Sequence, residues 1–382
     1  MTKPDILPSP LLARIAQTIE HAGGWIGFDE FMALALYTPG LGYYANDSVK
    51  FGTMPSAAKS QDAAGGSDFV TAPEMTPLFG QTLAAQVAQA LQVTQTSEVW
   101  EFGAGSGALA LQLLQTFQSL GLPLPQYRIV DLSGTLRARQ QLKLANYLDH
   151  VQWVSELPAT LQGVVIGNEV LDAMPVKLLA RIKGHWYERG VTQAPDAAQG
   201  DDAAAFVWHD HATDLRPPLA IEGEHDYLTE IHPQGESFVR TLADKLSAGA
   251  VFLIDYGFPE HEYYHPQRHM GTVMCHQGHQ SDTDPLQSVG LKDITAHVNF
   301  TGIALAAQDA GLSVLGYCTQ ARFLMNCGLL QRLENATLPE RTMAQKLIME
   351  HEMGELFKVI GLCKGEAWDA MGFTHGDRTH TL

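Results

Sequence analysis

The chain has 382 residues, of which 45% are hydrophobic and 17% are charged, and its formal net charge is −18. This length suggests about two to three domain equivalents, or one core with large insertions. No apolar run reaches the roughly 18 residues that a bilayer crossing needs, so no membrane insertion is expected. The negative charge disfavours general nucleic-acid binding and suits a basic partner better.

Residues 1–10 and the cysteines bear on the compartment. The N-terminal residues lack the apolar stretch of a presequence and include Asp5. The four cysteines lie far apart without CxxC spacing, which predicts neither a zinc knuckle nor a disulfide framework. Together these features predict a reducing compartment and a cytoplasmic location.

Residues 1–97 are expected to form a helical accessory region. Apolar residues recur with helical spacing over residues 11–37, with a break at Gly23-Gly24, which predicts two helices. Residues 46–68 are rich in Ser, Ala, Gly, Asp and Lys, a composition typical of a surface loop. Helical periodicity then returns over residues 77–91.

Residues 98–257 alternate strand-like and helix-like segments. The expected strands are 98–102, 127–132, 151–154, 163–167 and 250–255, and the expected helices between them are 108–120, 136–148 and 235–246. Repeated βα units of this kind predict an α/β fold with a parallel sheet covered by helices.

Two parts of the chain depart from this alternation. Short strand-like stretches at about 176–226 predict an inserted antiparallel lobe, whose hairpin tip is expected at 194–204. Residues 258–382 are expected to form a lid and a C-terminal extension. The lid, 258–300, has little periodicity and predicts an ordered loop.

A glycine-rich loop follows the first predicted strand of the core, with Gly103, Gly105 and Gly107 at alternate positions. Glycines let the backbone turn sharply and approach a ligand, and the helix that follows presents free N–H groups. The spacing satisfies both the dinucleotide fingerprint of an NAD-dependent oxidoreductase and the S-adenosylmethionine (SAM) loop of class I methyltransferases. Glu101, two residues before the first glycine, and the length of chain ahead of this strand favour SAM.

Polar residues follow two other core strands. Asp131 ends the second strand, where a carboxylate can accept hydrogen bonds from ribose hydroxyls of either cofactor. Asn168, Glu169 and Asp172 follow the strand expected beside the glycine-loop strand, so they are placed to orient a substrate amine or guanidinium. The spacing equally fits a helix cap followed by solvated acids.

Several short motifs occur in an order that resembles the MidA-like family of SAM-dependent methyltransferases. The resemblance covers nearly the whole chain, from Tyr37 to about Gly328. The segments that carry it are Asp68-Phe-Val-Thr-Ala-Pro-Glu74, Asn168-Glu169, Asp172-Ala-Met-Pro175, Trp186-Tyr-Glu-Arg189, Leu253-Ile-Asp-Tyr-Gly257, Asp284-Pro-Leu286 and Asp293-x-Thr-Ala-His-Val298. Family members generally carry Asp where this chain has Asn299, and often Arg where it has Gln280.

The resemblance implies a class I methyltransferase, a Rossmann-like fold with SAM as cofactor. Mitochondrial members are complex I assembly factors associated with protein arginine methylation, so the resemblance implies a protein substrate, for which a respiratory-complex subunit is the candidate. A SAM-binding assembly factor with little catalysis is an alternative. The expected cofactor-binding residues are Gly103, Gly105, Gly107, Glu101, Asp131, Thr71 and Asn168. The expected catalytic residues are Glu169, Asp172 and Glu74.

A metal site is not predicted. His261, His265 and His269 recur at helical spacing, but Pro259 and Pro266 interrupt a continuous helix. The spacing also matches no common zinc motif.

Overall fold

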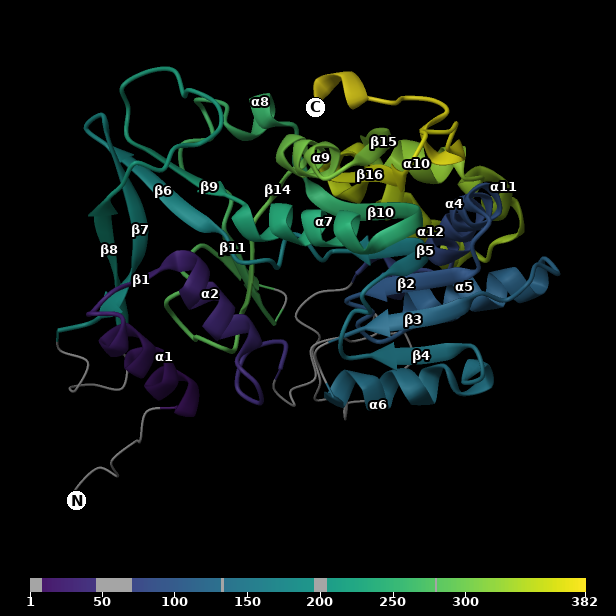
Figure 1. Cartoon of the computed structure of the whole chain (residues 1–382), viewed down its shortest axis with the longest axis horizontal. Coiled ribbons are helices and arrows are strands. Elements are labelled where there is room, and N and C mark those ends of the chain that lie inside the picture. The colour runs from purple at the N-terminus through teal and green to yellow at the C-terminus, as the bar shows by residue number, and fades with distance from the viewer. Residues whose placement is uncertain (1–8, 46–70, 132–133, 196–204, 279) are drawn as a thin grey trace. The chain divides into compact units, whose positions relative to one another are not determined.

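The computed structural model describes residues 9–45, 71–131, 134–195, 205–278 and 280–382. The predicted loop at 46–68 and most of the hairpin tip at 194–204 lie outside these ranges. The chain divides into two compact units (Figure 1). The first unit comprises Met1–Ser48, Ala173–Gln234 and Tyr264–Ala296, and the second comprises Val49–Asp172, Gly235–Tyr263 and His297–Leu382.

The second unit is built on a long mixed sheet. Its strand order is β15-β16-β10-β5-β2-β3-β4. The bounds are β2 Glu98–Phe102, β3 Gln126–Val130, β4 Val151–Val154, β5 Leu161–Asn168, β10 Leu246–Phe258, β15 Leu312–Thr319 and β16 Phe357–Lys364. Strands β4, β3, β2, β5 and β10 are parallel, whereas β16 is antiparallel to both of its neighbours. The predicted parallel sheet is confirmed, including the pairing of β2 with β5.

Helices cover both faces of this sheet. On one face α4 (Leu78–Thr94) packs against α5 (Ala108–Ser119), β5 and β10, and its side chains share a core with Ile166 and Phe252. Helix α9 (Phe300–Asp309) packs against β10, β15 and β16. Residues 251–254 of β10 are at most 1% exposed. Burial on both faces explains why this strand is a continuous apolar run, without polar alternation.

The remaining helices of the second unit complete these layers. Helix α7 precedes β10, and α10 to α12 lie between β15 and β16 in the chain (Figure 1). The bounds are α3 Ala72–Met75, α6 Gly134–Lys143, α7 Pro233–Lys245, α8 Glu260–Tyr263, α10 Gln320–Asn326, α11 Leu329–Asn335 and α12 Leu338–Ile348. Strand β14 (Val298–Asn299) pairs in parallel with the end of β10.

The first unit is mainly antiparallel, as predicted for the inserted lobe. Its larger sheet has the order β1-β7-β6-β9, and β8 pairs with β7. The bounds are β1 Ile26–Gly27, β6 Lys177–Ile182, β7 His185–Gln193, β8 Phe206–Ala212 and β9 Tyr227–Ile231. The two predicted N-terminal helices are α1 (Pro10–His21) and α2 (Phe28–Tyr37), and their buried faces share one core with Val176, Val191 and Phe206.

The sequence predicted an ordered loop over residues 258–300, and the structure differs there. A second sheet of the first unit has the order β12-β11-β13, with bounds Gln280–Asp282, Met274–Gln277 and Asp293–Thr295. Strands of three or four residues are too short for an alternating pattern to emerge, which is why periodicity missed them.

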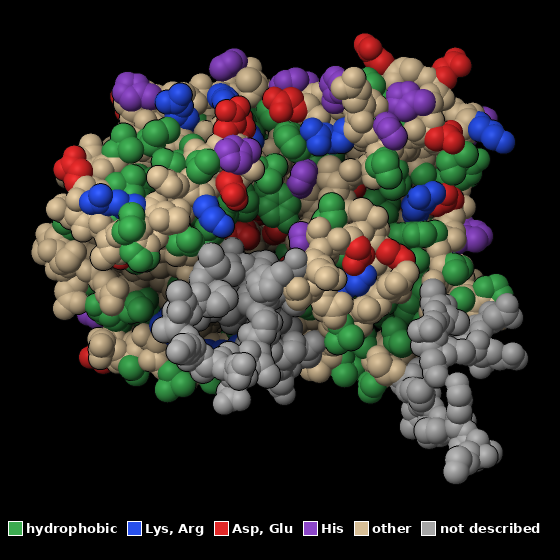
Figure 2. Space-filling model, turned by 180° about the vertical axis from the view of Figure 1, so that it is seen from behind, with side chains coloured by type: hydrophobic (Ala, Val, Ile, Leu, Met, Phe, Trp, Pro, Cys, Tyr) green, Lys and Arg blue, Asp and Glu red, His purple; other side chains and the backbone are tan. Residues whose placement is uncertain are grey.

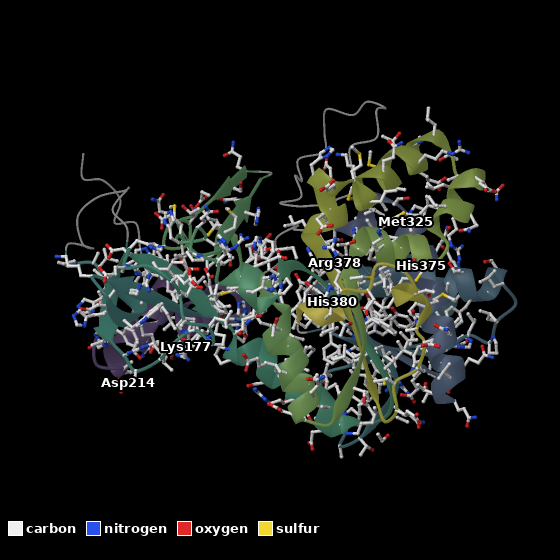
Figure 3. The ribbon with its side chains drawn as sticks, turned by 90° about the horizontal axis from the view of Figure 1, so that it is seen from above. Lys177, Asp214, Met325, His375, Arg378 and His380 are labelled. Carbon is white, nitrogen blue, oxygen red and sulfur yellow. The ribbon has the colours of Figure 1, made fainter. Side chains whose placement is uncertain are left out.

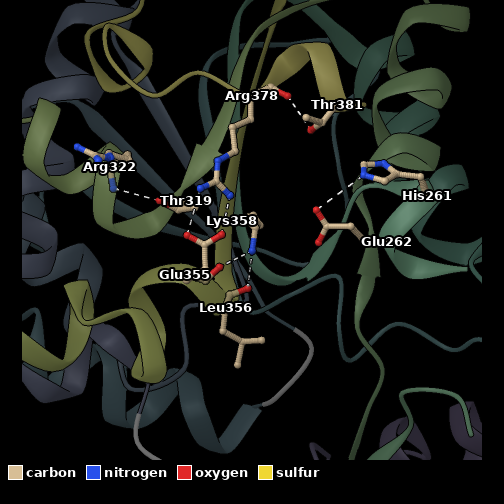
Figure 4. A network of polar contacts seen from close by, with 9 residues as sticks. All are labelled: His261, Glu262, Thr319, Arg322, Glu355, Leu356, Lys358, Arg378 and Thr381. Carbon is tan, nitrogen blue, oxygen red and sulfur yellow. Dashed lines mark hydrogen bonds and ion pairs between the residues drawn. The ribbon is translucent and has the colours of Figure 1, made fainter. Parts of the chain in front are cut away.

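Polar contacts hold the C-terminal residues against the rest of the second unit. The backbone N–H of Arg378, which Figure 3 labels, donates to the Tyr317 carbonyl at 2.6 Å. The Arg378 guanidinium lies 2.5 Å from the Glu355 carboxylate (Figure 4). The Lys358 ammonium donates to the backbone carbonyls of Glu355 and Leu356 (Figure 4). This network is structural, because main-chain carbonyls of the same segment satisfy its buried cation.

Candidate functional site

The glycine loop connects β2 to α5. Gly103, Gly105 and Gly107 have φ angles of +63°, +53° and +81°, in the left-handed region that favours glycine. A Cβ added to Gly103 would lie 3.2 Å from Cγ2 of Val170. The loop therefore needs glycine for its backbone conformation and, at Gly103, for its close approach to the turn after β5.

Asp131 is joined to this loop by a buried amide. Nε2 of Gln140, on α6, lies 2.9 Å from Oδ2 of Asp131 and 2.9 Å from the carbonyl oxygen of Gly105. Nε1 of Trp153 donates to Oε1 of Gln140 at 2.7 Å. Asp131 at the end of β3 and the glycine loop at the end of β2 are thereby brought together.

Glu101 lies within the sheet, immediately before the loop. It is 3% exposed, and its Oε2 accepts a hydrogen bond of 2.7 Å from the Tyr127 hydroxyl. Burial raises the pKa of Glu101 from 4.5 to about 7, with a further contribution from the charge of Asp131, while the Tyr127 hydrogen bond opposes the rise.

Thr71 and Glu74 lie at the start of the described segment that precedes α4. Thr71 is the N-cap residue of α3, and Glu74 is in its first turn. The Glu74 carboxylate accepts a hydrogen bond from the Ser106 hydroxyl and lies 3.5 Å from the Lys143 ammonium. Glu74 therefore contacts the glycine loop; Asp68 of the same motif lies outside the described residues.

Asn168 and Glu169 form the start of a turn after β5. Nδ2 of Asn168 donates to Oε1 of Glu169 at 2.9 Å, whereas Oδ1 of Asn168 is buried and accepts no hydrogen bond from the described residues. Glu169 has a φ of +55°, an unusual conformation for a residue with a side chain. Such backbone strain persists only where the surrounding structure holds it.

Asp255, at the end of β10, holds this turn. Its Oδ2 accepts hydrogen bonds from the backbone N–H groups of Val170, Leu171 and Asp172 at 3.2, 2.9 and 3.2 Å. The Tyr256 hydroxyl donates to Oδ2 of Asp172 at 2.6 Å. Burial raises the pKa of Asp255, and the neighbouring charges of Asp172 and Glu169 raise it further.

Apart from Thr71, the predicted residues fall into two neighbouring groups. The loop group contains Gly103, Gly105 and Gly107 with Asp131, Glu101 and Glu74. The acid turn contains Asn168, Glu169 and Asp172, and Gly103 meets it at Val170. Sequence reasoning did not assign to the site the residues that hold the members of each group in place. These residues are Tyr127, Gln140, Lys143, Trp153 and Asp255. The only signal for Gln140 would have been a polar residue on the sheet-facing side of a predicted helix.

Asn299, the departure from the family pattern, is the N-cap residue of α9. Its Oδ1 accepts a hydrogen bond from the backbone N–H of Gly302 at 3.3 Å. Asn and Asp are both favourable N-caps, so the change keeps this structural role. Gln280 lies in β12, where its side chain is exposed.

Comparison with known proteins identifies the family. Residues 82–318 match the family described as "Putative S-adenosyl-L-methionine-dependent methyltransferase", and the match covers more than half of the chain. The chain belongs to this family. The predicted MidA-like relationship, class I methyltransferase fold and SAM cofactor are confirmed. The NAD-dependent alternative is not favoured.

Solved structures agree with this assignment. A protein from Burkholderia thailandensis, bound to S-adenosyl-homocysteine, is 46% identical, with 98% of this chain and 99% of that chain covered and a TM-score of 0.88. A native structure of a protein from the same organism is 45% identical over the same shares of both chains, with a TM-score of 0.85.

The curated relatives are more distant. "Protein arginine methyltransferase NDUFAF7, mitochondrial" is 26% identical in Danio rerio, over 82% of this chain and 75% of that protein. The Homo sapiens protein of the same name is 24% identical, over 93% and 83%. These names contradict the predicted cytoplasmic location, which is withdrawn. The lack of a presequence pattern in ten residues was too little to identify a compartment.

Two further findings concern the described residues alone. Within them, no helix is both long and apolar enough to span a membrane. The same residues contain no cluster of three or more His, Cys, Asp or Glu side chains that could hold a metal ion.

On the face in Figure 2, Lys and Arg side chains are interspersed with Asp and Glu.

Proposed function

We propose that this methyltransferase transfers the methyl group of SAM to a nitrogen of a protein side chain, and that the acceptor is an arginine guanidinium. The observation that carries the proposal is the acid turn, whose Glu169 and Asp172 lie near Asp255 and beside the glycine loop. The names of the curated relatives support arginine as the acceptor. The MidA-like resemblance suggests a respiratory-complex subunit as the protein that carries it.

The residues of the loop group fit SAM. Three glycines with positive φ give the loop a tight turn at the carboxyl end of β2, and we assign them to the cofactor. Asp131 is assigned to the ribose hydroxyls, and the buried Oδ1 of Asn168 is an acceptor without a donor among the described residues. Thr71 is assigned to the same site, while Glu101 and Glu74 support the loop through Tyr127 and Ser106.

The acid turn is assigned to the acceptor. Bound SAM supplies an activated methyl group on a positively charged sulfonium. A guanidinium brought beside that charge needs compensating carboxylates, which Glu169 and Asp172 provide. Tyr256 fixes one oxygen of Asp172, and Asp255 fixes the backbone of the turn, so the carboxylates are oriented before the acceptor arrives. Glu169 would accept the proton that the nitrogen loses as the C–N bond forms and the C–S bond to the methyl group breaks, which leaves S-adenosyl-homocysteine.

Transfer of radioactive label tests the acceptor. The purified protein is incubated with tritiated SAM and cell extract, and the labelled band is analysed by mass spectrometry. We expect a methylated arginine in a protein. Label on a small molecule, a nucleic acid or another side chain would refute the arginine assignment.

A further inference from the structure

Gln140 is a fully buried polar residue with all of its side-chain groups engaged. It is 0% exposed, and three different elements supply its partners: the glycine loop, the end of β3 and the end of β4. Its aliphatic part also underlies the loop, because a Cβ added to Gly107 would lie 3.4 Å from Cγ of Gln140. One side chain therefore contacts two of the three loop glycines and Asp131.

The orientation of the amide follows from the chemistry of its partners. An indole N–H can only donate, so the Gln140 atom that faces Trp153 must be Oε1. The carbonyl oxygen of Gly105 and the carboxylate of Asp131 are acceptors, so they face Nε2, whose two hydrogens match them. A flipped amide would lose all three hydrogen bonds.

We infer that Gln140 is a positioning residue for SAM binding, whose amide locks Asp131 and the Gly105 peptide into one arrangement before the cofactor enters. The inference rests on the proposed assignment of Asp131 to the ribose. Preorganisation of this kind raises affinity for SAM, because no binding free energy is spent on ordering Asp131 and the loop. Trp153 takes part by fixing which end of the amide faces Asp131.

Gln140→Glu is the sharpest test, because it keeps the shape and replaces the donor by a titratable group. The charged group that Gln140 contacts is Asp131, just after β3. The charge of Asp131 acts on Glu101, Arg137 lies over the ring of Trp153, and Lys143 on α6 pairs with Glu74 of α3. Two adjacent carboxylates share a proton at low pH, and this proton restores a donor toward Asp131. At higher pH both are ionised, so they repel and the bridge is lost.

SAM affinity is measured by calorimetry between pH 6 and 8. For Gln140→Glu we expect affinity about ten-fold below the parent at pH 8, the loss of about one charge-assisted hydrogen bond, and a smaller deficit at pH 6. The matched control is Gln141→Glu, the exposed neighbour on the same helix, which should bind SAM as the parent does across this range. A deficit that stays constant with pH, or no deficit, would overturn the inference.

Two further variants keep the test decisive. Trp153→Phe adds no charge and releases the amide, so it should weaken SAM binding a few-fold at every pH; parental affinity would overturn the inference even if Gln140→Glu does not fold. Asp131→Ala separates the inference from the assignment on which it rests. Parental affinity in that variant would refute the ribose role itself, whereas weak binding there beside parental binding in Gln140→Glu would refute the role of Gln140 alone.

Discussion

In the first unit, cations lie against carboxylates: the ammonium of Lys177 is 3.0 Å from Asp29 and 2.7 Å from Glu188, and Arg189 makes two hydrogen bonds of 2.8 Å to Asp210 (Figure 3 labels Lys177). In the second unit, the carboxyl group of Asp255 is held by backbone N–H groups, and the charges that act on it are those of Asp172 and Glu169. The first arrangement pairs opposite charges, whereas the second gathers carboxyl groups around a buried acid and thereby raises its pKa.

This difference separates structural charges from functional ones. Half-buried ion pairs change stability little, since desolvation offsets much of the attraction. Buried like charges lower stability unless a ligand compensates them, and perturbed pKa values of this origin cluster at functional sites. Variants in the glycine loop and among the buried acids of the second unit should therefore change ligand binding or pH dependence, and variants of the first unit's ion pairs should change neither.

The largest effect is expected from Gly105→Val. Its φ of +53° is unfavourable for a β-branched residue, and the added side chain would stand where the cofactor approaches the loop. We expect SAM affinity to fall at least about 100-fold, measured by calorimetry. Gly121→Val is the matched control, with a φ of +65° and open space around its Cβ. It should lower stability and leave SAM affinity unchanged; equal losses in both variants would contradict the role of the loop.

A medium effect is expected from Glu101→Gln, as a change in pH dependence. The folded-state pKa of about 7 lies above the usual 4.5, so the folded protein holds this proton more tightly than the unfolded chain. The stability that protonation contributes is present below pH 4.5 and is lost as the pH rises through 7. The shift corresponds to about 3 kcal/mol.

Glutamine still accepts the Tyr127 hydrogen bond but does not titrate. Urea unfolding of parent and variant should therefore give a stability difference that moves in favour of Glu101→Gln as the pH rises from 4.5 to 8. If the unfolding free energies of the two proteins changed with pH in parallel, Glu101 would not have the raised pKa that its burial implies.

The smallest effect is expected from Lys177→Met in the first unit. Its side chain is 27% exposed, so solvent screens both ion pairs, and we expect a loss of at most about 1 kcal/mol in unfolding free energy. SAM affinity should equal that of the parent. A large loss of SAM affinity would remove the distinction between the two units.

Periodicity and composition were sufficient for the sheet of the second unit, because buried parallel strands such as 163–167 and 250–255 are continuous apolar runs. The pairing of β2 with β5 followed from the expected strand order of an α/β sheet, but pairings outside that sheet could not be predicted in this way. Strand β1 has only two residues and pairs with Val191 and Gly190, far along the chain. No local pattern encodes such a contact.

The candidate site divides similarly. Gly103, Gly105, Gly107 and Asp131 could be proposed from the sequence because they directly follow strands, where α/β sheets bind ligands. Gln140 and Asp255 act on other residues of the site, and which residues they reach is decided by packing between elements. Gln140 was found only in the structure. Asp255 lies in the motif Leu253-Ile-Asp-Tyr-Gly257, but its contacts were found only in the structure.

The central claim is that the acid turn serves methyl transfer and the glycine loop serves SAM binding. Single-turnover methyl transfer and SAM affinity of Glu169→Gln, with the exposed Glu366→Gln as control, test this claim most directly. The expected result is a rate at least about 100-fold below the parent with SAM affinity within about two-fold, and a control that matches the parent in both. A parental rate in Glu169→Gln, or a loss of SAM affinity as large as the loss of rate, would contradict it.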